Sequence, residues 1–121
     1  MPITYEIDAN RKLVTSRLWG AVSDDELHDH NTRLRADPDF VPDYRQLVDM
    51  TGLTEILVST KVINQTAIDH FFNPGTRRAL VASSDAAFGM ARMFALQSEG
   101  VGQIIEVFRD MRLAQEWLEL V

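Results

Sequence analysis

A short polar turn, Ser83-Ser84-Asp85, lies between a strand-like and a helix-like run and carries more reactive groups than its surroundings. Hydrolases place a nucleophilic serine at such a turn, but the glycines of the Gly-x-Ser-x-Gly elbow are absent here. Serine hydroxyls also cap helices, and the N–H groups at a helix N-terminus bind phosphate or carboxylate. We therefore interpret Ser83, Ser84 and Asp85, with Arg92 as a cationic partner, as a helix cap and a candidate anion site.

The histidines and the acidic cluster do not have the spacing of a metal site. His28 and His30 are two residues apart on a predicted helix, so they point away from each other and cannot chelate one ion. Residues 24–26 and Asp29 lack the spacing and the glycine of an EF-hand loop, so we interpret these acids as compensation for the helix dipole. No nucleophile is spaced near a histidine in the sequence. We predict no metal, no cofactor, no catalytic residue and no enzymatic activity.

The bulk composition restricts the partners. Twelve Lys and Arg against 18 Asp and Glu give a net charge of -6, which opposes binding to nucleic acid. The chain has no cysteine, and no apolar run approaches the roughly 20 residues of a membrane span. The first residues lack the features of a secretory signal. We expect one domain over residues 1–121, a cytoplasmic location and no membrane span.

The elements that must position these groups alternate between strands and helices. Ile3, Tyr5 and Ile7 alternate with polar residues, which predicts a strand, and residues 13–19 return beside it as a hairpin that ends at Gly20. Ser23, three residues before a glutamate, predicts a capping box and a helix that stops before a proline.

The second half continues the alternation. We expect a strand over 45–50, no assigned structure over 51–58, and a helix capped by Ser59 or Thr60. Strands over 78–82 and 103–108 then alternate with a helix over 86–96 and a closing helix capped by Asp110. If these strands are parallel, their following turns share one edge of the sheet, where ligands usually bind.

Several segments carry a resemblance to a known family. They are the strand Arg77-Arg78-Ala79-Leu80-Val81-Ala82, the helix Ala87-Phe88-Gly89-Met90-Ala91-Arg92-Met93-Phe94, and the end Val107-Phe108-Arg109-Asp110 with Trp117-Leu118. With the element order, they resemble the STAS domain superfamily and most closely its SpoIIAA-like family. The resemblance implies an α/β fold with a mixed sheet, an N-terminal β-hairpin followed by βαβαβα with mostly parallel strands and crossover helices, and a regulatory or binding role without catalysis.

The resemblance also marks a candidate phospho-switch. STAS proteins that antagonise anti-sigma factors carry a phosphorylated serine at the N-terminus of the second helix, within an Asp-Ser-Ser/Thr-Gly-like motif. The matching stretch here is Leu57-Val58-Ser59-Thr60-Lys61, which keeps the hydroxyls of Ser59 and Thr60 without the Asp and the Gly. We expect these hydroxyls to act mainly as a helix cap.

The helix over 86–96 is apolar on most of its circumference, although packing on a sheet buries only one stripe. We interpret Phe88, Met90, Met93 and Phe94 as a candidate interface, which predicts a homodimer or a regulatory protein partner; alternatively, neighbouring helices cover this surface. The expected function is a regulatory or binding module that acts through protein–protein interaction. The alternative is a binder of a lipid or other small apolar or anionic ligand at the same helix and sheet edge.

Overall fold

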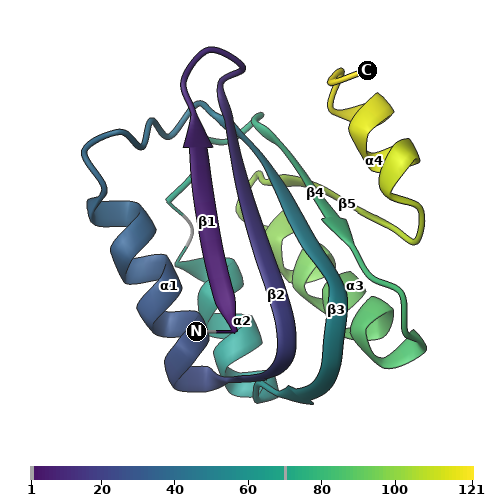
Figure 1. Ribbon diagram of the computed structural model, residues 1–121. Helices are drawn as coiled ribbons and strands as arrows, with labels where there is room; N and C mark the ends of the chain where they lie inside the picture. Colours follow the sequence, from purple (N-terminus) through teal and green to yellow (C-terminus); the bar gives the residue numbers. More distant parts are fainter. Residues whose placement is uncertain (1, 70) are drawn as a thin grey trace.

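Five strands form one mixed sheet in the order β1-β2-β3-β4-β5 in the computed structural model, which describes residues 2–69 and 71–121 (Figure 1). The first two strands pair antiparallel, and every later pair is parallel. The strands are β1 (Ile3–Asp8), β2 (Leu13–Ser23), β3 (Arg45–Leu57), β4 (Arg77–Val81) and β5 (Ile104–Phe108).

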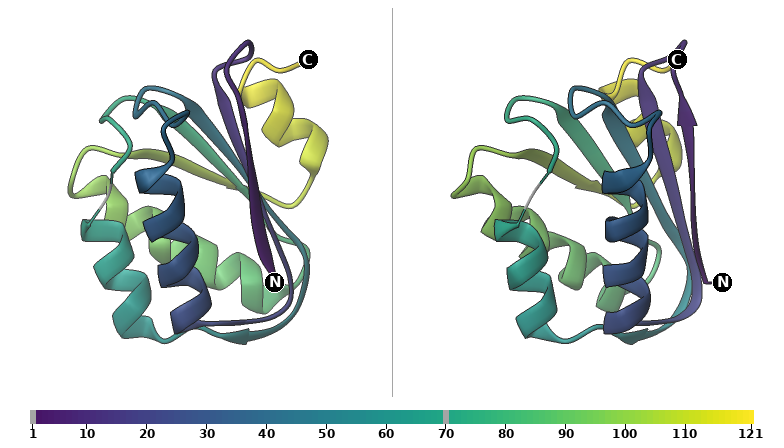
Figure 2. Two further views of the ribbon diagram at one scale, coloured as in Figure 1. Left: turned by 60° about the vertical axis from the view of Figure 1, so that its left-hand side comes forward. Right: turned by 90° about the vertical axis from the view of Figure 1, so that its left-hand side faces the viewer.

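Four helices cover the two faces of the sheet unequally. They are α1 (Asp24–Ala36), α2 (Thr60–Ile68), α3 (Asp85–Glu99) and α4 (Met111–Trp117). The first three lie on one face, which we call the inner face, and α4 lies on the outer face (Figure 2). This arrangement confirms the predicted fold class: an N-terminal hairpin, then strands and helices in alternation, with mostly parallel strands.

Three apolar clusters hold the layers together. On the inner face, Leu18 and Leu80 pack with Ala87 and Ala91 of α3, which fixes that helix against the sheet. A second inner cluster joins Val14, Leu34 and Phe72 beneath α1. The outer cluster lies under α4 and consists of Leu13, Leu47, Ala79, Val81, Ala114 and Leu118.

The helix starts follow the predicted chemistry. Ser23 Oγ accepts a hydrogen bond from Glu26 N at 3.3 Å, and Glu26 Oε1 accepts one from Ser23 N at 3.0 Å. This is the predicted capping box, which satisfies N–H groups that otherwise lack a partner in the first turn.

Two strands run further than predicted. β2 continues past Gly20 to Ser23, because Gly20 adopts a φ of 63° at a register irregularity and bends the strand without ending it. β3 likewise continues past Met50 to Leu57. The two strands approach closely where Gly52 lies against Trp19: a Cβ on Gly52 would be 2.9 Å from Trp19 Cβ.

The unequal strand lengths divide the predicted functional edge. Asp49 of β3 lies opposite Val81 at the end of β4, and β3 then continues to Leu57. Those eight further residues span about 26 Å of extended chain. Ser23 and Ser59 therefore follow the long strands, whereas Ser83, Ser84 and Asp110 follow the short ones. The parallel strands β2 to β5 all end toward the same edge of the sheet, as expected, but the turns after the long strands lie at a different level from those after the short strands.

Candidate functional site

The start of α3 already holds a carboxylate of the chain itself. Ser84 caps the helix, since its Oγ accepts a hydrogen bond from Ala87 N at 3.1 Å. The Asp85 carboxylate lies 2.7 Å from Arg109 Nη2, and Arg109 Nη1 donates to Ser83 O at 3.3 Å. The predicted cap is confirmed. The candidate anion site at Ser83, Ser84 and Asp85 remains a prediction. The Asp85 carboxylate would compete with a bound anion for Arg109.

Arg92 does not belong to this group. It lies seven residues after Asp85 on the same helix, which places it about 10 Å further along the axis. The cation at the turn is Arg109, because β5 ends beside β4 in the parallel sheet and brings its following residue to the start of α3. The structure shows the contact of Arg109 with this turn, so the pairing of Arg92 with Ser83 and Ser84 stays a prediction. The β4–β5 adjacency is the signal that points to Arg109.

Ser59 is the cap of α2, and Thr60 is the first residue of the helix. Ser59 Oγ accepts from Val62 N at 3.2 Å, and Ser59 N donates to Asp24 Oδ1 at 2.7 Å. Both hydroxyl residues are exposed. The capping prediction is confirmed for Ser59, and its phosphorylation stays a prediction.

The two apolar faces of α3 have different environments. Ala87 and Ala91 are buried, and three of the candidate interface residues, Phe88, Met90 and Phe94, are half-buried against the core. The fourth, Met93, is 36% exposed. An outward row remains, which we call the outer stripe of α3: Ala86, Gly89, Met93 and Leu96.

A serine and a histidine meet in the interior, which the sequence spacing did not indicate. Ser16 Oγ lies 3.0 Å from His30 Nε2, and His30 Nδ1 lies 2.9 Å from Asn31 Oδ1. The sequence spacing shows no nucleophile–base pair, and this one was missed because β2 and α1 bring together residues 14 positions apart. The available signal was a polar residue at an inward position of β2.

This serine is nevertheless placed as a structural group. Ser16 and His30 are 1% and 4% exposed, and Gln46 Nε2 donates to Ser16 Oγ at 3.3 Å. The Asn31 amide oxygen favours a proton on His30 Nδ1, so Nε2 accepts from the serine. Burial lowers the pKa of His30, which keeps the ring neutral. Every polar atom named here has a partner, so the buried side chains of Ser16, His30 and Gln46, with the half-buried Asn31, form a satisfied network.

The network continues to a buried arginine. Arg78 Nε donates to Gln46 Oε1 at 3.0 Å and Nη1 donates to Gln103 Oε1 at 3.1 Å. Its guanidinium carbon lies 4.3 Å from the centre of the Phe72 ring. Burial lowers the pKa of Arg78 to about 9, so the side chain stays charged at neutral pH. Within the described part of the chain its partners are neutral amides and aromatic rings.

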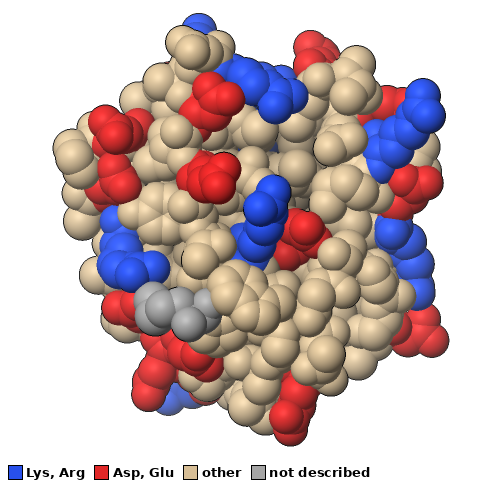
Figure 3. Space-filling model, in the orientation of Figure 1, with Lys and Arg blue, Asp and Glu red and all other residues tan. Residues whose placement is uncertain are grey.

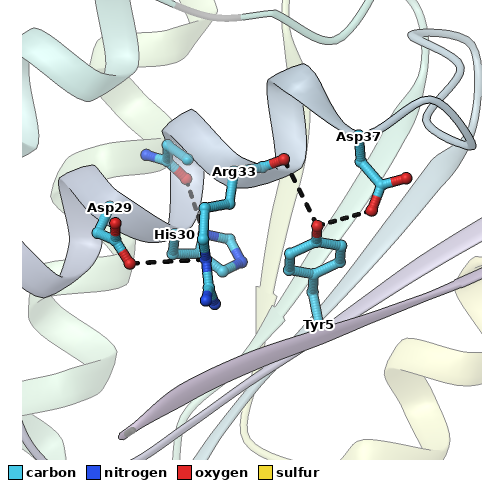
Figure 4. A network of polar contacts seen from close by, with 6 residues as sticks. Tyr5, Asp29, His30, Arg33 and Asp37 are labelled. Carbon is cyan, nitrogen blue, oxygen red and sulfur yellow. Dashed lines mark hydrogen bonds and ion pairs between the residues drawn. The ribbon is translucent and has the colours of Figure 1, made fainter.

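Tyr5 closes the network at the surface (Figure 4). Its ring meets His30 edge-to-face at 5.7 Å, and its hydroxyl donates to Asp37 Oδ2 at 2.7 Å. Burial and the neighbouring Asp37 raise the pKa of Tyr5. The Asp39 N–H and then the tyrosine hydroxyl lower the pKa of Asp37. These contacts hold β1 against α1, from His30 in the middle of the helix to Asp37 at its C-cap.

The surface hollows lie away from α3. One, of about 810 Å³, runs between α1 and α2, and we call it the α1–α2 trough. A second, of about 200 Å³, lies where the start of β1 meets α1, and a third, of about 460 Å³, lies beside Pro74 and Arg77. Among the described residues, none from α3 lines any of these three.

Two further properties of the described residues concern metal ions and membranes. Within residues 2–69 and 71–121, no group of three or more acidic or histidine side chains is arranged to hold a metal ion. In the same part of the chain, no helix combines the length and the apolar character that crossing a bilayer requires.

Comparison with known proteins gives the class of fold. No family model and no curated protein matches the chain. Among solved structures, it is similar to an uncharacterized protein of the DUF3478 family with a SpoIIAA-like fold from Shewanella loihica PV-4. The two are 17% identical, with a TM-score of 0.65 over 96% of this chain and 93% of the other. The fold is SpoIIAA-like, which confirms the fold that the resemblance in the sequence implied.

Proposed function

We propose that the protein is a non-enzymatic regulatory or binding module that acts through protein–protein contact, with the outer stripe of α3 as its interface. The observation that carries this proposal is the position of Met93 and Leu96, which are 36% and 59% exposed on a helix whose opposite face is buried. Small neighbours, Ala86 and Gly89, leave room for close approach of a second helix; nothing lies within 4 Å of a Cβ added to Gly89.

A second copy of the chain is the occupant to which we commit. The four stripe residues are uncharged, so two copies related by a twofold axis can bring them together with the neighbouring Asp85 and Arg92 at the rim of the contact. Burying apolar surface contributes about 25 cal/mol per Å², which favours covering the stripe. The same apolar character suits a regulatory protein partner. We further propose a cytoplasmic location, with which the absence of cysteine agrees.

The surface charge argues against nucleic acid as the partner. On the face shown in Figure 3, Lys and Arg alternate with Asp and Glu, and no continuous basic tract is present. Phosphate backbones are bound by clustered basic side chains. With a net charge of -6, the chain offers little attraction to such a partner.

Light scattering after gel filtration tests the proposal. A dimer of the 13.7 kDa chain should have a mass of twice that value, about 27 kDa. Met93→Glu should give a folded monomer, because a carboxylate buried without a partner is costly. A wild-type mass of 13.7 kDa at every concentration would contradict the self-association.

Leu113→Glu is the matched control. Leu113 is 53% exposed on α4, across the sheet from α3, so its replacement adds the same charge to a comparable apolar position. We expect this variant to keep the mass of the wild type. Equal loss of the dimer in both variants would show that the added negative charge, and not its position in the outer stripe, causes the dissociation.

A further inference from the structure

The α1–α2 trough is tied at both ends. Near the helix N-termini, Ser59 N donates to Asp24 Oδ1 at 2.7 Å. Near the C-termini, Arg35 Nη2 donates to Asp69 O at 3.1 Å and lies 3.4 Å from Asp69 Oδ2. These contacts require α1 and α2 to run in the same direction, side by side, as Figure 2 shows. The trough occupies the space between the two ties.

The walls of the trough combine methyl groups with hydrogen-bonding groups. Val62 and the Thr32 and Thr66 side chains line its walls, and Ile68, which is 63% exposed, lines the end near Asp69. In a closely packed helix pair such residues would interlock, whereas here they border a hollow of about 810 Å³. Eleven residues separate Asp24 from Arg35, so the trough is about 16 Å long.

Negative charge is concentrated at one end. Asp24 and Asp25 line the trough near the start of α1, and Asp25 is exposed, with no ion pair to any described residue. At the other end, Arg35 balances Asp69. A ligand of matching length would therefore place its positive end beside Asp24 and Asp25. Helices carry this polarity naturally, because Lys and Arg in the last turn stabilise the C-terminal end of the helix dipole.

We propose that the α1–α2 trough binds an amphipathic helix of a partner protein, about three turns long and antiparallel to α1 and α2. Its apolar stripe packs on Val62 and Ile68, and the basic residues of its last turn lie against Asp24 and Asp25. Helix-in-groove binding of this kind uses anchors at spacings of three and four residues. The trough is separate from the outer stripe of α3, so this proposal stands apart from self-association.

Two peptides of identical composition test the polarity. Both are lactam-bridged helices of about 12 residues with a leucine stripe; one has two lysines in its last turn and the other has them in its first turn. Titration into the ¹⁵N-labelled full chain should shift amide signals of the trough, with affinity at least threefold higher for the C-terminal lysines. Equal affinity for the two peptides, shifts centred outside the trough, or no binding of either would overturn the proposal.

Variants of the chain locate the contact. Asp25→Asn should weaken the preferred peptide about threefold. Asp29→Asn, the same change one turn later and outside the trough wall, should not. Thr32→Trp should fill the trough and abolish the shifts, with the thermal unfolding curve showing that the fold is kept. Binding that is insensitive to both Asp25→Asn and Thr32→Trp would assign the peptide to another surface. Spermidine competing as well as the preferred peptide would show a site for small cations and would contradict the helix.

Discussion

His30 is the group whose burial should give the protein a measurable pH dependence. The pKa of His30 is lowered in the folded chain, so its imidazole binds a proton less readily there than in the unfolded chain, where its pKa is about 6.5. The free energy of unfolding should therefore fall as the pH drops below about 6.5 toward the lowered value, and should be fully present above it. Urea unfolding across this range measures the slope.

His30→Gln should flatten that slope, because it removes the buried imidazole. An unchanged slope in His30→Gln would mean that another group causes the pH dependence.

Ser16 should matter for stability through both of its buried partners. Ser16→Ala leaves His30 Nε2 and Gln46 Nε2 without their contacts, so the free energy of unfolding should fall by about 1–3 kcal/mol. Ser83→Ala is the control: that side chain is exposed, and a change within about 0.5 kcal/mol is expected. Chemical denaturation of both variants makes the comparison, and equal effects would show that the buried network adds nothing.

At the scale of the elements, alanine substitutions of Ser59 and Thr60 should have clearly different effects on the free energy of unfolding. Ser59 supplies the capping oxygen of α2, so Ser59→Ala should lower the free energy of unfolding by about 1 kcal/mol. Thr60→Ala should change it by less than about 0.5 kcal/mol, since Thr60 is an exposed helical residue. Thermal unfolding provides the measurement. Stoichiometric phosphate on either residue in protein isolated from its host would instead support the switch.

The same substitution should act in opposite directions at two glycines. Gly52→Ala brings a methyl group to 2.9 Å from Trp19 Cβ, and should lower the free energy of unfolding by about 1–3 kcal/mol. Gly89→Ala adds its methyl group to open space within α3, and should raise it by about 0.5–1 kcal/mol. Denaturant unfolding at low protein concentration measures both free energies. A shift of the two variants in the same direction would contradict the prediction.

Local patterns predicted the elements well and the contacts between them less well. Capping at Ser23, Ser59 and Ser84 depends on neighbours within three residues, so the sequence shows it directly. The Arg109–Asp85 and Ser16–His30 contacts join residues far apart in the chain. The first depends on the adjacency of β4 and β5, and the second on the packing of α1 against β2. The extension of β2 past Gly20 was missed because a glycine with positive φ can bend a strand as well as end it.

For the whole molecule, the arrangement of helices explains where binding is expected. Among the described residues, α4 is the helix on the outer face, and α1 to α3 share the inner face (Figure 2). On that inner side, α3 turns an uncharged stripe outward, whereas α1 and α2 leave a trough with an acidic end. The outer stripe and the trough therefore lie on different helices, which fits a module with two separate contacts.

The most direct test of the α3 interface is amide hydrogen exchange of the wild-type chain at dilute and at concentrated protein. Self-association through the outer stripe predicts slower exchange in the concentrated sample over α3, around Met93 and Leu96, with no change over α4 around Leu113. Identical exchange at both concentrations, or new protection confined to α4 or to the outer face of the sheet, would contradict the account.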